Sequence, residues 1–147
     1  MTGNSSSGFS LVEVTLALGI ASLCLIAVFG LVPIGVQTNR TAIAQTAAVS
    51  ILSSVTADLR STPQANTTSA VFGIPFGTTT TLYFNGEGTF SPVIDVNSRY
   101  RLVVTFPASP AGSFAPTFAS LRVTWPAAAD PLSPSGSTET FAAFDRN

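Results

Sequence analysis

Residues Val14–Val36 read VTLALGIASLCLIAVFGLVPIGV, and this stretch determines how the rest of the chain is interpreted. Only Thr15 and Ser22 interrupt its 23 residues with polar side chains. As a helix it would be about 34 Å long, which exceeds the roughly 30 Å of a hydrocarbon core. Each of the two hydroxyls can donate to a carbonyl one turn earlier. The stretch therefore predicts a membrane-spanning helix.

A cleaved secretory signal peptide is the main alternative to a retained membrane helix. Such peptides begin with basic residues, have an apolar stretch of about 7–15 residues and end at a small-residue cleavage site. The first eight residues, MTGNSSSG, contain no basic side chain, and the apolar run is too long. The first suitable small-residue triplet, 42–44, lies too far along the chain. The sequence favours a helix that stays in the membrane.

The helical pattern continues beyond the apolar stretch. Apolar residues recur at spacings of four, three, four and four, which is typical of an amphipathic helix; they are Ala44, Ala48, Ile51, Val55 and Leu59. Other positions, Gln37, Arg40, Gln45 and Asp58, are expected on its polar faces. Pro63 disfavours helical geometry at Thr62 and ends the helix.

One helix is therefore expected from Phe9 to about Arg60. Near its middle, Gly30 and Pro33 predict a bend, because proline removes a backbone hydrogen bond from the helix interior. The expected division is a leader at 1–8, a membrane half at 9–36, an amphipathic half at 37–62 and a C-terminal domain at 63–147.

Beyond residue 77 the apolar period changes from helical to alternating. Strands are expected over segments rich in β-branched and aromatic residues, with a turn at 85–88 after the first; these segments are Thr78–Phe84, Tyr100–Phe106, Ala119–Trp125 and Thr138–Phe144. About 85 residues make a small independent core, so the sheet is expected to pack against the apolar stripe of the helix. The predicted fold class is α+β.

Composition argues against catalysis. Charged residues make up 9% of the chain, where soluble domains carry about 25%. All six basic residues are arginine, histidine and lysine are absent, and Cys24 is the single cysteine. Without imidazole, lysine or a second thiol, the usual general bases, phosphate loops and thiolate metal clusters are missing. No enzyme activity, cofactor, small-molecule substrate or nucleic-acid partner is expected.

Glu13 is the residue that composition alone does not explain. It directly precedes the apolar run, where a carboxylate is costly unless it reaches the interface or meets a positive partner. The nearest positive side chain in the sequence is Arg40. Glu13 either reaches the interface and sets the helix end, or pairs with a cation from another chain, such as an amine created by proteolysis just upstream.

The segment Gly8-Phe9-Ser10-Leu11-Val12-Glu13-Val14, followed at once by a long apolar helix, resembles the N-terminal motif of type IV pilins and pseudopilins. The resemblance implies that a prepilin peptidase cuts between Gly8 and Phe9 and methylates the new amino terminus of Phe9. It also implies that Glu13 pairs with the amino terminus of a neighbouring subunit. A long helix carrying an antiparallel sheet is similar to the lollipop architecture of that family.

By this resemblance the chain is expected to be a structural minor subunit of a type II secretion pseudopilus or a related type IV filament. Its partners would be the prepilin peptidase, other pilin-like subunits and the bacterial inner membrane, with a single membrane pass and the C-terminal domain in the periplasm before assembly into the filament. The segments 82–89 and 125–126 also resemble the Verru_Chthon cassette protein B group of pilin-like proteins.

Two alternatives remain open. The C-terminal domain could be a filament-tip module that binds secreted cargo, DNA or a surface through Arg99, Arg101, Arg122 and the loop 107–117, although the low charge argues against DNA. The expected role of these three arginines is instead to face solvent and pair with Asp and Glu residues. The chain could also be a membrane-anchored domain that never assembles. Asp95, Asn97 and Asp130 are conceivable calcium ligands, but solvated turns are the expected role and no metal site is predicted.

Two departures from the family pattern bear on these expectations. The leader carries no lysine or arginine, so charge gives no support for the membrane orientation, which rests on the cleavage motif. The family's disulfide-bounded C-terminal loop is also missing, because Cys24 is the single cysteine. This absence weakens the likeness to adhesive major pilins and is neutral for pseudopilins.

Overall fold

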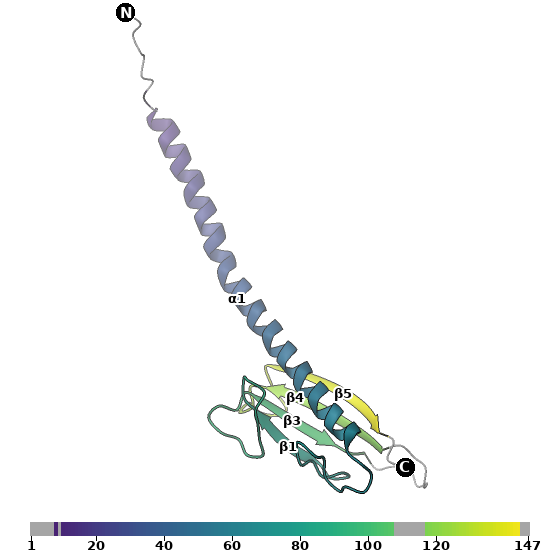
Figure 1. Cartoon of the computed structure of the whole chain (residues 1–147). Helices are drawn as coiled ribbons and strands as arrows, with labels where there is room; N and C mark the ends of the chain where they lie inside the picture. The colour runs from purple at the N-terminus through teal and green to yellow at the C-terminus, as the bar shows by residue number, and fades with distance from the viewer. Residues whose placement is uncertain (1–7, 9, 108–116, 145–147) are drawn as a thin grey trace, which may run out of the picture. The chain divides into compact units, whose positions relative to one another are not determined.

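The computed structural model describes residue 8 and residues 10–107 and 117–144 (Figure 1). It divides into two compact units, 1–41 and 42–147, which are treated separately below. The fold is α+β, as the sequence predicted: one long N-terminal helix whose second half packs on an antiparallel sheet.

Helix α1 runs from Leu11 to Ser61 without interruption. Its end lies one residue beyond the predicted position, and the predicted first residue, Phe9, lies outside the described residues. Gly30 and Pro33 both lie inside this continuous element, and the bend expected there stays a prediction.

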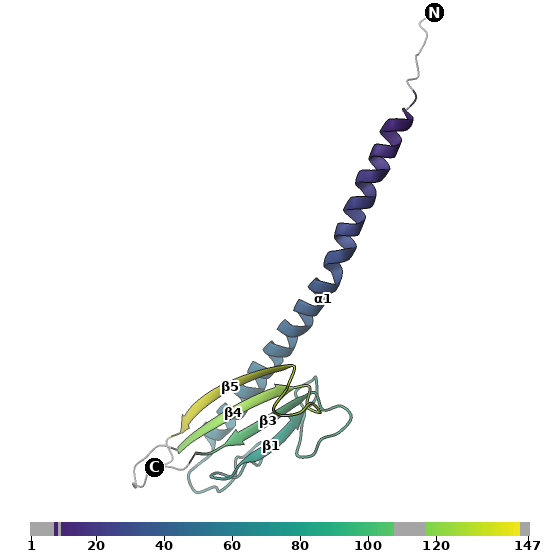
Figure 2. The ribbon, with the colours of Figure 1, turned by 180° about the vertical axis from the view of Figure 1, so that it is seen from behind.

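The sheet has five strands in the order β2-β1-β3-β4-β5, and every neighbouring pair is antiparallel (Figure 2). The strands are β1 Thr80–Phe84, β2 Phe90–Ser91, β3 Tyr100–Thr105, β4 Thr117–Trp125 and β5 Gly136–Phe144. The four predicted strands are confirmed with small shifts at their ends. The sequence did not predict β2, because two residues are too few to show an alternating pattern.

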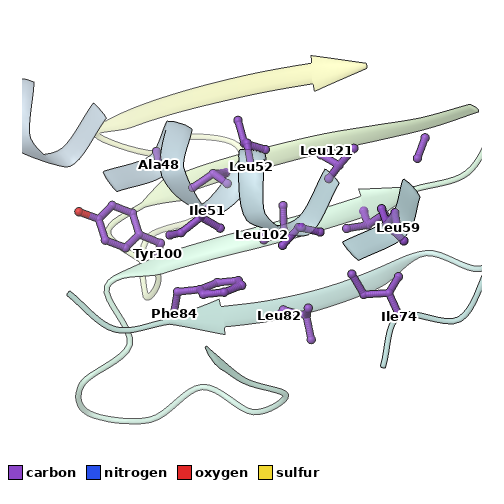
Figure 3. Packing of buried hydrophobic residues seen from close by; sticks show 14 of the residues in the cluster. Ala48, Ile51, Leu52, Leu59, Ile74, Leu82, Phe84, Tyr100, Leu102 and Leu121 are labelled. Atoms are coloured by element: carbon purple, nitrogen blue, oxygen red, sulfur yellow. The ribbon is translucent and has the colours of Figure 1, made fainter. Parts of the chain in front are cut away.

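The core lies between the second half of α1 and one face of the sheet (Figure 3). All five residues of the predicted helical stripe are buried, together with Leu102, Val104 and Leu121 from the central strands. Figure 3 shows Ala48 and Tyr100 toward one end of this interface, and Leu59 and Ile74 toward the other. The first of these is called the Tyr100 end of the sheet; the strand residues Phe84, Trp125 and Gly136 lie there by register.

Asp58 is the exception to the predicted polar face of the helix. It is only 5% exposed, and its two carboxylate oxygens accept hydrogen bonds from the backbone N–H groups of Val71 and Phe72 at 3.0 and 3.1 Å. The expectation that Asp58 faces solvent is therefore wrong. The chain returns over the last turn of α1 after Pro63, and two backbone donors that it brings there need an acceptor.

Strand β5 forms one edge of the sheet. It pairs along all nine of its residues with β4, from Gly136 opposite Trp125 to Phe144 opposite Thr117. On its other side it pairs with no strand among the described residues. Its outer row of backbone donors and acceptors is therefore not used within the sheet.

Candidate functional site

The first unit presents an apolar helix surface with no polar face. Large apolar side chains from Leu11 to Val36 are exposed at positions all around α1, and none of the residues in its most apolar window is buried. A helix that is apolar on every side belongs in a bilayer or inside an assembly. By length and composition α1 is able to cross a membrane once.

The few polar groups of this segment are satisfied within the helix. The hydroxyl of Thr15 donates to the carbonyl of Val12 at 2.9 Å, and that of Ser22 donates to the carbonyl of Leu18 at 2.7 Å. The predicted bonding of both hydroxyls to the preceding turn is confirmed. These bonds lower the cost of placing the two side chains in an apolar medium.

Glu13 lies in the first turn of α1 and is exposed. The carbonyl of Ser10 accepts hydrogen bonds from the backbone N–H groups of Glu13 and Val14, at 3.0 and 3.1 Å, so Ser10 occupies the N-cap position. The carboxylate is thus at the positive end of the helix dipole, which favours a negative charge. The Ser-x-x-Glu spacing of a capping box is present at 10–13 and was missed in the sequence.

The expected processing site lies at the limit of the described residues. Gly8 is exposed, and a side chain added there would meet no other atom within 4 Å. Phe9, the residue expected to become the methylated amino terminus, lies outside the described residues. The predicted roles of Gly8, Phe9 and Glu13 therefore stay predictions.

The three arginines considered for a binding surface have different surroundings. Arg101 is half-buried, and its guanidinium donates to the backbone carbonyls of Ala127 and Ala129, the second at 2.9 Å. The interpretation of Arg101 as a solvent-facing partner of an acidic residue is therefore wrong: it holds the loop after β4. Arg122 lies opposite Glu139 in register and diagonal to Arg101, whereas Arg99 lies in the connection before β3.

The acidic residues considered as calcium ligands are engaged in turns. Oδ1 of Asp95 accepts from the backbone N–H of Asn97 at 2.8 Å and from the hydroxyl of Ser98 at 3.0 Å. Oδ1 of Asp130 accepts from the backbone N–H of Leu132 at 2.9 Å. In the part of the chain that the structure describes, no group of three or more His, Cys, Asp or Glu side chains comes together.

The sheet unit also contains a hydroxyl-rich groove of about 490 Å³ between α1 and β5. Ser53 and Thr56 line it from the helix, and Thr138 and Thr140 line it from the strand. Its two ionisable lining residues are Arg60 and Glu139. This set supplies hydrogen-bond donors and acceptors.

No family model, curated protein or solved structure matches the chain. The chain combines one apolar helix able to span a membrane, a carboxylate in the first turn of that helix, and a small sheet domain built on its second half.

Proposed function

We propose that the chain is a pilin-like structural subunit, made as a membrane precursor and assembled through the apolar half of α1. The observation that carries the proposal is the isolation of Glu13. It is the only charged side chain in the first 39 residues of the sequence, and it lies in the first turn of α1, directly before the apolar and exposed stretch Val14–Val36.

The charge of Glu13 is costly at this position in a membrane helix. A carboxylate near the end of a membrane helix costs up to several kcal/mol when it has no partner, and a paired charge costs much less. Cleavage between Gly8 and Phe9 would create an amine four residues before Glu13. In a bundle of parallel helices, the amine of one subunit is the cation that the carboxylate of the next requires. Assembly then neutralises both groups.

In this proposal the chain crosses the bacterial inner membrane once, with the sheet domain in the periplasm. A prepilin peptidase removes residues 1–8, and the subunit enters a type II secretion pseudopilus or a related filament as a minor component. The work of assembly comes from a separate motor, because the sequence contains no nucleotide-binding loop.

The decisive experiment is mass spectrometry of the amino terminus after co-expression with a prepilin peptidase. The expected product begins at a methylated Phe9. A peptidase inactivated in its catalytic residues is the control and should leave the precursor uncut. A product that still begins at Met1 or Thr2 in the presence of active peptidase would overturn the proposal.

A further inference from the structure

Two loops at the Tyr100 end of the sheet present large apolar side chains to solvent. The loop between β2 and β3 exposes Val93, Ile94 and Val96, and the loop between β4 and β5 exposes Leu132. Val96 is 98% exposed and Leu132 is 92% exposed. These four side chains are called the apolar tip. Such a group on a small domain marks a surface that is covered by a partner.

Hydrogen bonds hold the two loops together. The backbone N–H of Ala127, in the second loop, donates to the carbonyl of Arg99, in the first, at 2.9 Å. The Arg101 guanidinium described above ties the second loop to β3. The two loops that carry the apolar side chains are therefore joined to each other and to β3.

The local turns fix how the apolar tip is presented. Asp95 directly precedes Val96, and its carboxylate closes a turn on the backbone of Asn97. Asp130 does the same for the backbone of Leu132. Each carboxylate is thus turned toward the backbone of its own loop, while the side chains of Val96 and Leu132 are exposed to solvent. Preorganisation of this kind reduces the entropy that is lost when the tip binds.

The position of the apolar tip indicates what covers it. Ala48 and Tyr100 lie at the same end of the helix–sheet interface, so α1 enters the sheet unit at the same end as the two loops (Figure 3). Seven residues separate Val36, the last residue of the apolar stretch, from Ala44, the first buried residue of the stripe. Even fully extended, this connection spans at most about 29 Å. The chain therefore tethers the Tyr100 end near the expected membrane surface.

We propose that the apolar tip inserts into the lipid interface and docks the sheet unit on the bilayer before assembly. The proposal rests on the membrane span proposed above. The two loops and the turn at 85–88 carry three acidic residues, Glu87, Asp95 and Asp130, and one basic residue, Arg99. Since this surface has no excess of positive charge, burial of apolar side chains drives the docking, and attraction to anionic lipid contributes little.

The test uses the full chain in phosphatidylcholine vesicles, with Cys24→Ala as background. Single cysteines replace Val96 or Leu132 and carry an environment-sensitive fluorophore. Val71→Cys is the matched control, because Val71 is 64% exposed and lies at the opposite end of the interface, held by Asp58. Nitroxide lipids labelled near the headgroup should quench positions 96 and 132 at least about twofold more than position 71, because interfacial side chains lie about 5–10 Å below the surface.

Labelling the native Cys24 separates failure of this proposal from failure of the membrane span. If Cys24 is quenched by deep nitroxides while positions 96 and 71 behave alike, lipid docking is overturned and the span stands. If Cys24 is not quenched, the span fails, and the docking that rests on it is overturned as well. Quenching at position 96 that requires phosphatidylglycerol, or that disappears at high salt, would also overturn docking by apolar insertion.

Discussion

Gly136 and Trp125 lie directly opposite each other in the register of β4 and β5, and the indole of Trp125 occupies the space of a side chain at position 136. A Cβ at Gly136 would lie 2.3 Å from Cζ2 of Trp125. The indole also packs edge-on against Tyr100, with ring centroids 6.2 Å apart. The glycine therefore permits the aromatic pair that closes the Tyr100 end of the core.

Gly136→Ala is expected to destabilise the sheet unit by about 1–3 kcal/mol, because the indole must move away from the new methyl group. Urea unfolding of the detergent-solubilised chain measures this directly, since Trp125 is the only tryptophan and reports through its own fluorescence. Gly86→Ala is the control: its Cβ would meet only Cδ of Arg99, at 3.9 Å, and the expected change is within about 0.5 kcal/mol. Equal midpoints for the two variants would contradict the packing argument.

Asp58→Asn is expected to destabilise the fold by about 1–3 kcal/mol. The backbone N–H groups of Val71 and Phe72 each donate to a separate carboxylate oxygen of Asp58, whereas an asparagine side chain has only one acceptor oxygen. The same urea titration measures the loss. Asp95→Asn is the matched control, since an exposed turn of this kind accepts asparagine as readily as aspartate. If both substitutions had the same small effect, the buried carboxylate would not be required to hold the segment after Pro63.

The sheet unit should depend on residues 42–61 of α1. Leu59 is buried, and Leu59→Ala should cost about 2–5 kcal/mol, whereas Val49→Ala, at an exposed position on the same helix, should cost less than about 0.5 kcal/mol. By the same reasoning, a fragment that begins at residue 42 should show cooperative unfolding and the Trp125 signal. A fragment that begins at residue 63 should show neither. Cooperative folding of the shorter fragment would refute this dependence.

Glu13→Gln should leave cleavage at Gly8 intact and reduce incorporation into filaments. Removing one partner of a buried charge pair costs about 3–5 kcal/mol, since the amine of the neighbouring subunit keeps its charge without an acceptor. Quantifying the variant in sheared filaments against the membrane pool measures the effect. Glu87→Gln, which removes a carboxylate from an exposed turn, should assemble normally. Normal assembly of the Glu13 variant would exclude the charge pair while leaving the membrane span untouched.

The sequence was sufficient to predict the elements that have a periodic pattern. The stripe from Ala44 to Leu59 predicted the buried face of α1, and alternation from Tyr100 to Val104 predicted the inner face of β3. In both cases one side of a regular element faces the apolar core, so apolar residues recur in the sequence with the period of the helix or of the strand.

Features that depend on contacts between residues far apart in the sequence were not predicted. The burial of Asp58 follows from a loop thirteen residues later, and the space at Gly136 is filled by a tryptophan from the neighbouring strand. The partners of Arg101 are backbone carbonyls, which carry no sequence signal. The capping-box spacing at Ser10 and Glu13, by contrast, is local and can be read from the sequence.

Among the residues that the structure describes, no strand pairs with the outer side of β5, and this has a consequence for handling the protein. The strand has nine residues, GSTETFAAF, with a single charge and neither proline nor lysine, the residues that commonly protect a sheet edge. Phe141 is exposed on it. In a concentrated aqueous preparation of the sheet unit, the outer edge of β5 is able to pair with the same edge of another molecule and so to promote aggregation. Ser137→Lys, at an exposed position of β5, would place a charge on this edge and oppose such pairing.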